Sequence, residues 1–335
     1  MIRFLPLVLL FGCGSPTDRV VVYCAQDAEY AEGVFAEFTQ AGKQTVAPKF
    51  DTEANKSVSL AVELEQEAGR PRCDVHWNNE ILGTIRLARK GIYAPYSSPN
   101  AADFPARSKA SDGTWQAFAE RARVLIVNTK LVPEGERPKS IFDLTRPKWR
   151  GKVAMAKPQF GTTATQAACL FEVLGDESAK AFFRGLKANE VALLPGNKSV
   201  ARGVADGQYA IGFTDTDDAV LEVIAGKPVA ILFPDEAGHP EFPRMGTLFI
   251  PNTLAVVKGA PNEAGAKAII DFLLTREADL ATGGGYQYPV APAQVARPHP
   301  ALKTRHEVTR MAVDFDRAAD KWDAVQAFLR DEFAR

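Results

Sequence analysis

Apolar residues along this chain alternate between short runs and helical spacing, which predicts strands followed by helices. Residues 20–23 form a run typical of a strand, and from Tyr30 to Phe38 apolar residues recur on one helix face. The same order returns with strands at 46–50 and 73–77 and helices at 57–68 and 80–90. This alternation predicts right-handed βαβ crossovers and a mostly parallel sheet. Ligands of such sheets bind beyond the carboxyl ends of the strands, which here are residues 24–27 and 76–80.

A second block with the same alternation covers residues 130–248, and long apolar runs lie on either side of it, at 122–128 and 247–257. Two long strands around an inserted block are what two lobes joined by a two-stranded hinge require. We therefore expect an α/β fold with two lobes, each built on a mostly parallel sheet flanked by helices. Lobe I would comprise residues 19–122 and 252–290, and lobe II residues 123–251 and 291–335. Helical spacing in the last thirty residues predicts a segment that clasps one lobe against the other.

The N-terminal segment combines one positive charge, an apolar run over residues 4–11 and a glycine before Cys13. This pattern is typical of a secretory signal, and residues 10–13 are similar to a bacterial lipobox. We expect residues 1–18 to be a signal peptide and tether, with a diacylglycerol on Cys13 after cleavage. A bilayer span needs roughly 20 apolar residues, so the lipid would anchor the chain without a membrane-spanning helix. The alternative is a buried strand at residues 2–11.

Composition narrows the functional classes. After removal of the leader about 320 of the 335 residues remain, enough for two domains. The 40 basic and 41 acidic residues include no run of like charge, which argues against nucleic acid as a partner. The cysteines have neither disulfide-framework nor zinc-site spacing, so Cys24, Cys73 and Cys169 are expected to be small buried hydrophobic residues.

The motifs of common catalytic sites are absent from the sequence. It contains no Gly-x-Ser-x-Gly, His-Glu-x-x-His, Walker or Rossmann pattern, and its four histidines lack metal-ligand spacing. We therefore expect a binding protein, without cofactor, in place of an enzyme. A metal-dependent hydrolase remains the outside alternative, because carboxylates are clustered near residue 215.

Several segments occur in the order typical of the extracellular solute-binding proteins of bacterial ABC importers. They are residues 22–27, 51–56, 74–80, 147–152, 161–163, 206–212 and 287–289. The ordered set resembles this family, and in particular its ferric-ion-binding branch, over residues 20–292. The resemblance implies a type II periplasmic-binding fold that closes over a small ligand and delivers it to an ABC permease in the inner membrane. It also implies a monomer in the periplasm or another extracytoplasmic location, which a lipid anchor would suit.

In the ferric branch a histidine, a glutamate and two adjacent tyrosines commonly hold the iron. The corresponding positions here are Asp27, Asn79 or Glu80, and the loop 214–218, so the tyrosine pair is missing. The carboxylates that remain are Asp27, Glu80, Asp215, Asp217 and Asp218, and the first four are the expected metal ligands. Carboxylate oxygens suit ferric iron or another hard cation, and equally an ammonium group. The alternative for Asp27 and Asp218 is a helix cap, worth about 1 kcal/mol.

An anion is expected beside the carboxylates. Gly161, Thr162 and Thr163 open a helix after a strand, so their N–H groups and hydroxyls would receive phosphate or carbonate. The resemblance implies that this anion binds together with iron, as a synergistic anion. Arg121 or Arg123 would complete its pocket. An ordinary threonine cap is the alternative.

Aromatic residues offer two further contacts. Trp77 ends a strand where we expect the cleft, and its ring would stack on an organic cation, with core packing as the alternative. Tyr286 and Tyr288 resemble a cleft-rim segment of the family, and either phenol would substitute for a missing ligand.

The sequence thus favours a substrate-binding lipoprotein of an ABC importer, with ferric iron and a synergistic anion as the cargo. The alternative cargo is an organic cation such as a polyamine or an aminoalkylphosphonate.

Overall fold

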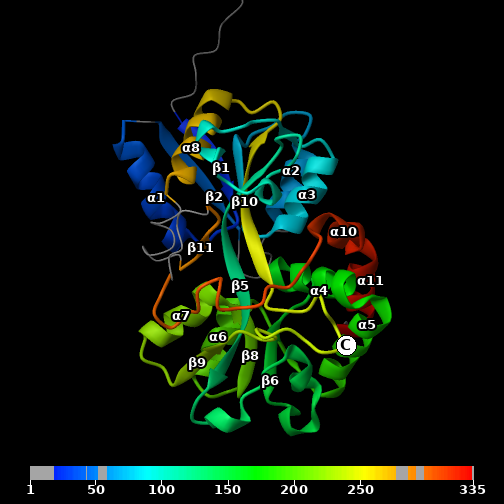
Figure 1. Cartoon of the computed structure of the whole chain (residues 1–335). Helices are drawn as coiled ribbons and strands as arrows, with labels where there is room; N and C mark the ends of the chain where they lie inside the picture. Colours follow the sequence, from blue (N-terminus) through cyan, green and yellow to red (C-terminus); the bar gives the residue numbers. More distant parts are fainter. Residues whose placement is uncertain (1–18, 43, 52–58, 277–285, 292–297, 334–335) are drawn as a thin grey trace, which may run out of the picture.

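Two α/β lobes lie one above the other in the computed structural model of this protein (Figure 1). The structure describes residues 19–42, 44–51, 59–276, 286–291 and 298–333. The expected signal peptide and Cys13 lie outside these residues. Strands β5 (Gln116–Asn128) and β10 (Phe249–Val257) run through both lobes and join them. The two-lobed α/β architecture with a two-stranded hinge, predicted from the hydrophobic pattern, is therefore confirmed.

The upper lobe is built on a sheet in which β1 lies between β2 and β3, all parallel. Its strands are β1 (Arg19–Cys24), β2 (Thr45–Phe50), β3 (Val75–Asn78) and β4 (Tyr93–Ala94). Its helices are α1 (Ala28–Gln40), α2 (Ser59–Gln66), α3 (Ile81–Arg89) and α8 (Glu263–Leu274). Strands β1, β2 and β3 are each followed by a helix, because apolar residues switch from strand to helical spacing at that point. The carboxyl ends of β1 and β3 lie on the side of the lower lobe (Figure 1).

The lower lobe repeats this arrangement around β6, which pairs in parallel with β7 and β8. Its strands are β6 (Val153–Ala156), β7 (Ala192–Leu194), β8 (Ile211–Asp215) and β9 (Val229–Leu232). Its helices are α4 (Gly161–Leu174), α5 (Asp176–Ala188), α6 (Asn197–Ala205) and α7 (Thr216–Ile224). Helix α7 begins directly after β8, so two aspartates lie in its first turn.

The hinge strands pair antiparallel, from Phe249 opposite Ala122 to Leu254 opposite Gln116. The register shifts between Asn252 and Thr253, next to Pro251. A proline has no N–H for the ladder, so an irregularity beside it is expected. The lobe boundaries expected at 122/123 and 251/252 fall within these strands and stay predictions. Short strand β11 (Tyr288–Pro289) also pairs with β5.

The C-terminal helices α10 (Phe315–Asp320) and α11 (Trp322–Phe333) lie beside α4 and α5 (Figure 1). Val325 and Leu329 are buried there. On the upper lobe, Arg89 of α3 forms ion pairs with Asp316 (3.0 Å) and Asp320 (2.8 Å) of α10. The expected contact of this segment with both lobes is confirmed, although its helices begin only at residue 315.

Two further expectations concern single features. Cys24, Cys73 and Cys169 are buried, as expected of small hydrophobic residues. Within the described residues, no helix combines the length and apolar character needed to cross a bilayer.

Helix α6 packs directly on β8 and leaves no space for a side chain at Gly212. A Cβ added there would lie 2.4 Å from Cγ1 of Val200 and 3.0 Å from Cγ2 of Val204. We expect Gly212→Ala to lower the free energy of unfolding by about 1–3 kcal/mol, measured by urea denaturation, because the added methyl overpacks this contact. The control is Gly33→Ala in α1, where a Cβ meets nothing within 4 Å, and a helix-interior Ala should stabilise by about 0.5–1 kcal/mol. Equal midpoints for both variants would contradict this packing.

Candidate functional site

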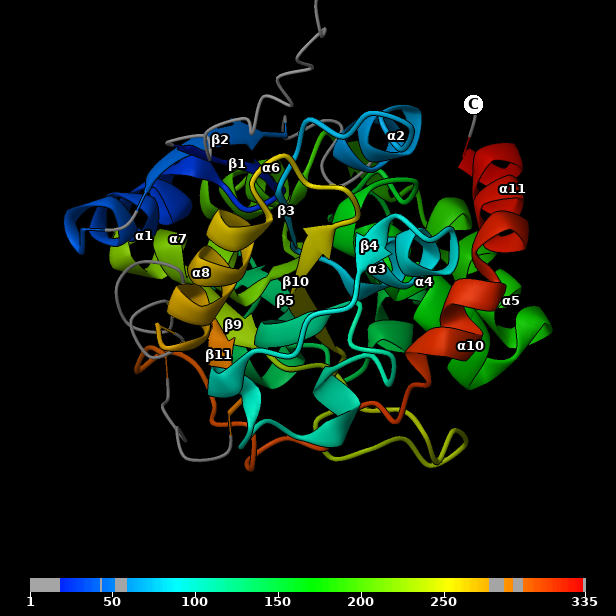
Figure 2. The same ribbon diagram turned by 90° about the horizontal axis from the view of Figure 1, so that it is seen from above.

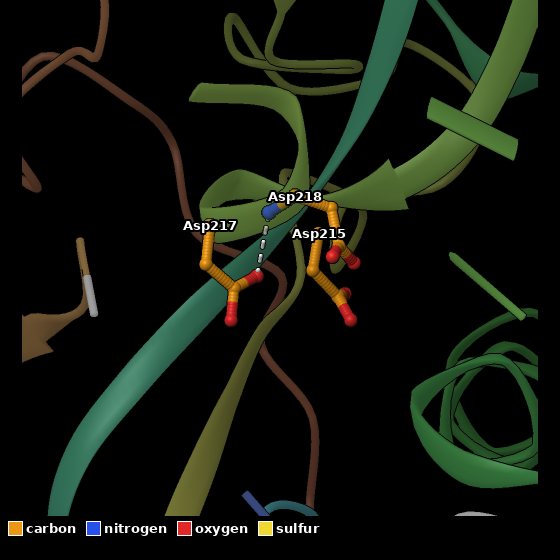
Figure 3. Close-up of side chains that lie close together, drawn as sticks. All are labelled: Asp215, Asp217 and Asp218. Atoms are coloured by element: carbon orange, nitrogen blue, oxygen red, sulfur yellow. Dashed lines mark hydrogen bonds between the residues drawn. The ribbon is translucent and has the colours of Figure 1, made fainter. Parts of the chain in front are cut away.

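Three aspartates lie together where β8 ends and α7 begins (Figure 3). Asp215, Asp217 and Asp218 are all buried, and one carboxylate oxygen of each lies within 4.8 Å of the others. The backbone N–H of Asp218 donates to Oδ1 of Asp217 (3.1 Å). Asp215 occupies the N-cap position of α7, but its side chain makes no capping hydrogen bond. Its carboxylate is therefore available for contacts outside this helix.

Two buried arginines on β5 offset most of this negative charge. Arg123 Nη1 donates to Asp215 (2.8 Å), and Arg121 Nη1 donates to Asp217 (2.9 Å). Arg121 and Arg123 are 3% and 2% exposed. They alternate with apolar residues on β5, so both side chains leave the same face of the strand. Because buried charges are tolerated when paired, these ion pairs explain how three carboxylates lie so close together.

The ion pairs also determine the protonation of Asp215. Burial alone raises the pKa of this carboxyl, but the charges of Arg123 and Arg121 and hydrogen bonds from Arg123 and Thr162 outweigh it. The pKa of Asp215 is therefore held below its usual value, and the side chain is ionised at neutral pH.

A set of polar side chains ties the aspartates to the starts of α4 and α6. Thr162 Oγ1 donates to Asp215 (2.7 Å), and Asn197 Nδ2 donates to the same oxygen (2.9 Å). Thr163 Oγ1 donates to Asn197 (3.3 Å), and Arg123 also reaches Gln166 (3.0 Å). The two threonines expected to bind an anion thus have their hydroxyls within this network. The N-terminus of α4, where both threonines lie, still points toward the aspartates.

A cavity of about 20 Å³ lies beside the aspartates. Gly161 and Thr162 line it from the start of α4, and Gly196 and Asn197 from the start of α6. Neither helix has a side-chain cap, so their N-terminal partial charges face the cavity. The chain enters α4 at Gly161 with a φ of 55°, a conformation that favours glycine.

Charged side chains of both signs complete the lining of this cavity. Arg121 and Lys157 supply positive charge, while Asp215 and Asp218 supply negative charge. In this conformation the cavity has room for little more than a water molecule. The arrangement suits an oxyanion at the helix starts with a positive group next to Asp218.

Two other expected residues lie on the upper-lobe side. Asn79 lines the cavity, donates to the carbonyl of Ala25 (2.9 Å) and accepts from Arg121 through its own carbonyl (2.9 Å). Asp27 is at the N-cap position of α1 and lines a separate depression with Lys198 of α6. Lys198 Nζ lies 2.7 Å from Glu29 of α1, an ion pair between the lobes. The structure thus places Asp27 near the gap between the lobes, outside the three-aspartate group.

Glu80 has a different role from the one expected. It is buried and caps α3, where its two oxygens accept from the N–H of Gly83 at 2.8 and 3.0 Å. Thr165 of α4 donates to it as well (2.7 Å), and burial raises the pKa of Glu80. Because these donors occupy both oxygens, Glu80 acts as a helix cap and lobe-to-lobe contact here. This corrects the expectation that it joins the aspartates as a metal ligand.

Trp77 also requires a correction. Its side chain is fully buried, and its ring packs edge-on against Phe35 (5.7 Å between centroids) and Phe118 (5.4 Å). Both faces of a parallel strand are covered by other elements, so a tryptophan there is part of the core. Trp77 therefore has no face available for stacking on a cargo.

The expected tyrosines lie elsewhere, and another one was missed. Tyr288 is buried and donates to the carbonyl of Lys303 (2.7 Å), while the ring of Tyr286 packs edge-on against His299. Tyr30 of α1 has a buried hydroxyl without a hydrogen-bond partner among the described residues. Burial, followed by the charges of Asp217 and Asp218, raises the pKa of Tyr30. Its spacing in the sequence indicated only packing, so no local signal pointed to the site.

Asn197 and Lys157 were missed as well. Asn197 follows a Pro-Gly pair just before a helix, which marks a helix start whose N–H groups are open to a ligand. Lys157 follows β6, at the carboxyl end of a parallel strand, where the general rule for such sheets places ligands. Both signals are present in the sequence.

The comparisons with known proteins agree with this architecture. Residues 85–319 match the family described as bacterial extracellular solute-binding protein. This match covers more than half of the chain, so the chain belongs to that family. Solute-binding proteins of this family work with ABC transporter permeases. The family is thus one of solute-binding proteins.

Curated relatives are similar over most of their length. Iron uptake protein A1 of Synechocystis is 26% identical over 84% of this chain and 81% of that protein. The major ferric iron-binding protein of Neisseria meningitidis is 25% identical over 88% of both chains. These relatives are periplasmic or extracellular binding proteins.

Solved structures show the same fold. Iron-bound HitA from Pseudomonas aeruginosa superposes with a TM-score of 0.79 at 21% identity, over 94% of this chain and 99% of that one. AfuA from Actinobacillus pleuropneumoniae, with exogenous fructose-6-phosphate bound, has a TM-score of 0.80 at 23% identity, over 94% and 98%. The type II periplasmic-binding fold is thereby confirmed, and the two neighbours carry cargoes of different chemistry.

Loss of one ion-pair partner tests the charge balance at the aspartates. We expect Asp215→Ala to lower the free energy of unfolding by about 3–5 kcal/mol in urea denaturation at pH 7, because Arg123 is left buried and unpaired. The control Asp103→Ala removes an exposed carboxylate and should have little effect. The folded-state pKa of Asp215 is depressed, so its stabilisation is present above pH 4 and is lost as the pH falls through that pKa. A loss no larger than that of Asp103→Ala would show that the ion pair contributes nothing.

Proposed function

We propose that this protein is the extracytoplasmic solute-binding component of an ABC importer, and that its cargo is a compact species bearing an oxyanion. One observation carries the proposal. The uncapped starts of α4 and α6, together with Arg121 and Lys157, surround a small cavity, and the neighbouring Asp215 and Asp217 are already paired with arginines. The positive charge around this cavity is thus as large as the negative charge.

Charge argues against a bare cation as the cargo. A metal ion bound to Asp217 would face the guanidinium of Arg121, which lies 2.9 Å from that carboxylate. Like charges at such distances repel strongly in a buried site. A polyamine is disfavoured for the same reason, and because Trp77 offers no exposed ring face.

An anion meets none of these objections. Helix N-termini bind phosphate and carboxylate groups through their N–H groups and dipoles. Lys157 is exposed at the rim and able to approach such a group. Asp218 on the same cavity would receive a positive group of the cargo. A zwitterion such as an aminoalkylphosphonate satisfies both sides and is our first choice.

Ferric iron with phosphate or carbonate is the second candidate. The closely spaced carboxylate oxygens are hard ligands of the kind ferric iron prefers, and the buried hydroxyl of Tyr30 lies on the opposite lobe. The anion would offset the positive charges that oppose a bare ion. The names of the iron-binding relatives support this candidate, at an identity of about a quarter.

A panel of thermal-shift measurements tests the cargo. Phosphate and 2-aminoethylphosphonate should each raise the melting temperature without iron, whereas spermidine should not. A ligand at 100 times its Kd stabilises the folded protein by about 2.7 kcal/mol. A shift that requires ferric iron together with the anion would favour the second candidate. A shift with spermidine alone would overturn the proposal.

Lys157→Met tests the contact with the oxyanion. Removal of a charge-assisted contact should weaken binding of 2-aminoethylphosphonate about tenfold in calorimetry, since Lys157 lines the cavity. Lys130→Met, which removes an exposed lysine outside the cavity, is the matched control and should bind as the unchanged protein does. Equal affinities of the two variants would contradict the placement of the anion.

The location of the protein is a further part of the proposal. We propose that Cys13 carries a lipid and that the chain works as an anchored monomer beside its permease. Cys13→Ser should move the protein from the membrane fraction to the soluble fraction, because the acylated sulfur is removed. Ser15→Ala is the control and should stay with membranes. An unchanged distribution of the Cys13 variant would rule out this anchor.

A further inference from the structure

A second cavity lies on the other face of the hinge, away from the aspartates. It measures about 240 Å³, is lined by Glu120 of β5 and Pro251 of β10, and shares no lining residue with the cavity beside the aspartates. Adjacent residues of a strand point to opposite faces, so Glu120 leaves β5 on the side opposite to Arg121. Viewed from above, α6 and the segment that leads into α10 lie on opposite sides of β5 and β10 (Figure 2). That segment contributes residues 310–313 to the lining, and we call this space the hinge pocket.

The segment before α10 forms a fixed wall of the hinge pocket. Thr247, just before β10, donates its N–H to the carbonyl of Thr309 (2.9 Å) and accepts from the N–H of Met311 (2.9 Å). Arg310 lies between these two bonds, and both of its terminal nitrogens donate to the carboxylate of Glu120, at 2.6 and 2.7 Å. The backbone and the side chain of Arg310 are therefore both held in place without a ligand.

The hinge pocket carries an excess of positive charge. Its charged lining residues are Arg107, Arg305, Arg310 and Glu120. The side chain of Glu120 is 6% exposed and pairs with Arg310 (2.6 Å) and, at 3.4 Å, with Arg305. Arg107 is exposed and forms no ion pair with any residue that the structure describes. Three guanidinium groups against one carboxylate leave two positive charges unbalanced. Since the side chain of Arg305 is only 13% exposed, solvent screens this excess less than it would at an open surface.

Apolar side chains supply much of the remaining lining. They are Phe249, Val290, Met311, Val313 and Phe315. The guanidinium of Arg310 also lies over the ring of Phe249, 4.2 Å from its centroid. A compact inorganic ion would contact the arginines and leave this apolar surface in water, whereas a carbon chain would cover it. Guanidinium groups match carboxylates in geometry as well as in charge. Two carboxylates joined by a short apolar chain therefore fit both the net charge and the lining.

We propose that the hinge pocket is a binding site for a short aliphatic dicarboxylate, separate from the cavity that holds the cargo. One carboxylate is held by Arg305 and Arg310, and the other by Arg107. Arg107 comes from the upper lobe, where the nearby Phe104 is part of the core. The other two arginines come from the segment bonded to Thr247, so the ligand contacts both sides of the hinge. The identity of the cargo does not enter this proposal.

Calorimetry on the full chain with glutarate tests the site. Glutarate should bind, whereas glutaramide, the neutral diamide of the same length, should not, because the two unbalanced charges require an anion. Arg107→Gln should weaken glutarate binding about tenfold, since one charge-assisted contact is lost. Arg70→Gln removes an exposed arginine outside the pocket and is the matched control, with affinity unchanged. Both substitutions are at exposed positions, so neither variant depends on repacking of the core.

Lys157→Met separates this site from the cargo cavity, because Lys157 lines only the latter among the two. Glutarate binding should be unaffected by this change. If Lys157→Met abolishes glutarate binding and Arg107→Gln does not, the dicarboxylate occupies the cargo cavity and the hinge pocket is not a site. Equal binding of glutarate and glutaramide, or equal affinities of the Arg107 and Arg70 variants, would also overturn the proposal. If glutarate does not bind at all, the hinge pocket assignment is wrong and the proposed function stands.

Discussion

The pairing of two buried arginines on β5 with the aspartates at the end of β8 is the interaction on which the site depends. Arg121 and Arg123 approach Asp217 and Asp215 at 2.9 and 2.8 Å, with all four side chains almost fully buried. Without these cations three carboxylates in one turn would repel each other in a poorly solvated environment. With them, the start of α7 becomes a nearly neutral surface instead of a strongly acidic one.

This pairing also connects the site to the hinge. Strand β5 carries both arginines and runs through both lobes, and Arg121 donates to the carbonyl of Asn79 in the upper lobe (2.9 Å). Two more contacts cross between the lobes, from Lys198 to Glu29 and from Thr165 to Glu80. Of these contacts between the lobes, the one from Arg121 to Asn79 joins two residues that line the cavity. A cargo that contacts α4 and Asn79 would add to this set and favour closure.

Much of the fold follows from the sequence, because strand and helix spacing alternate clearly in both halves. The resemblance to the ferric-ion-binding branch brought the loop 214–218 to the site. The arginine pairs could not be predicted, since Arg123 meets a partner 92 residues away, although two arginines alternating with apolar residues on a strand were a signal. Trp77 was misassigned because strand position alone does not show that both faces are covered. Glu80 was misassigned because glutamate is an uncommon N-cap.

The most direct test of the account is a crystal structure with arsenate, whose anomalous scattering locates a phosphate-like anion independently of any model bias. We expect an arsenic peak within hydrogen-bonding reach of the first N–H groups of α4 and α6, near Lys157, with the ion pairs of Arg121 and Arg123 intact. An arsenate-free cavity, together with a metal ion bound among Asp215, Asp217 and Asp218 and both arginines displaced, would contradict it.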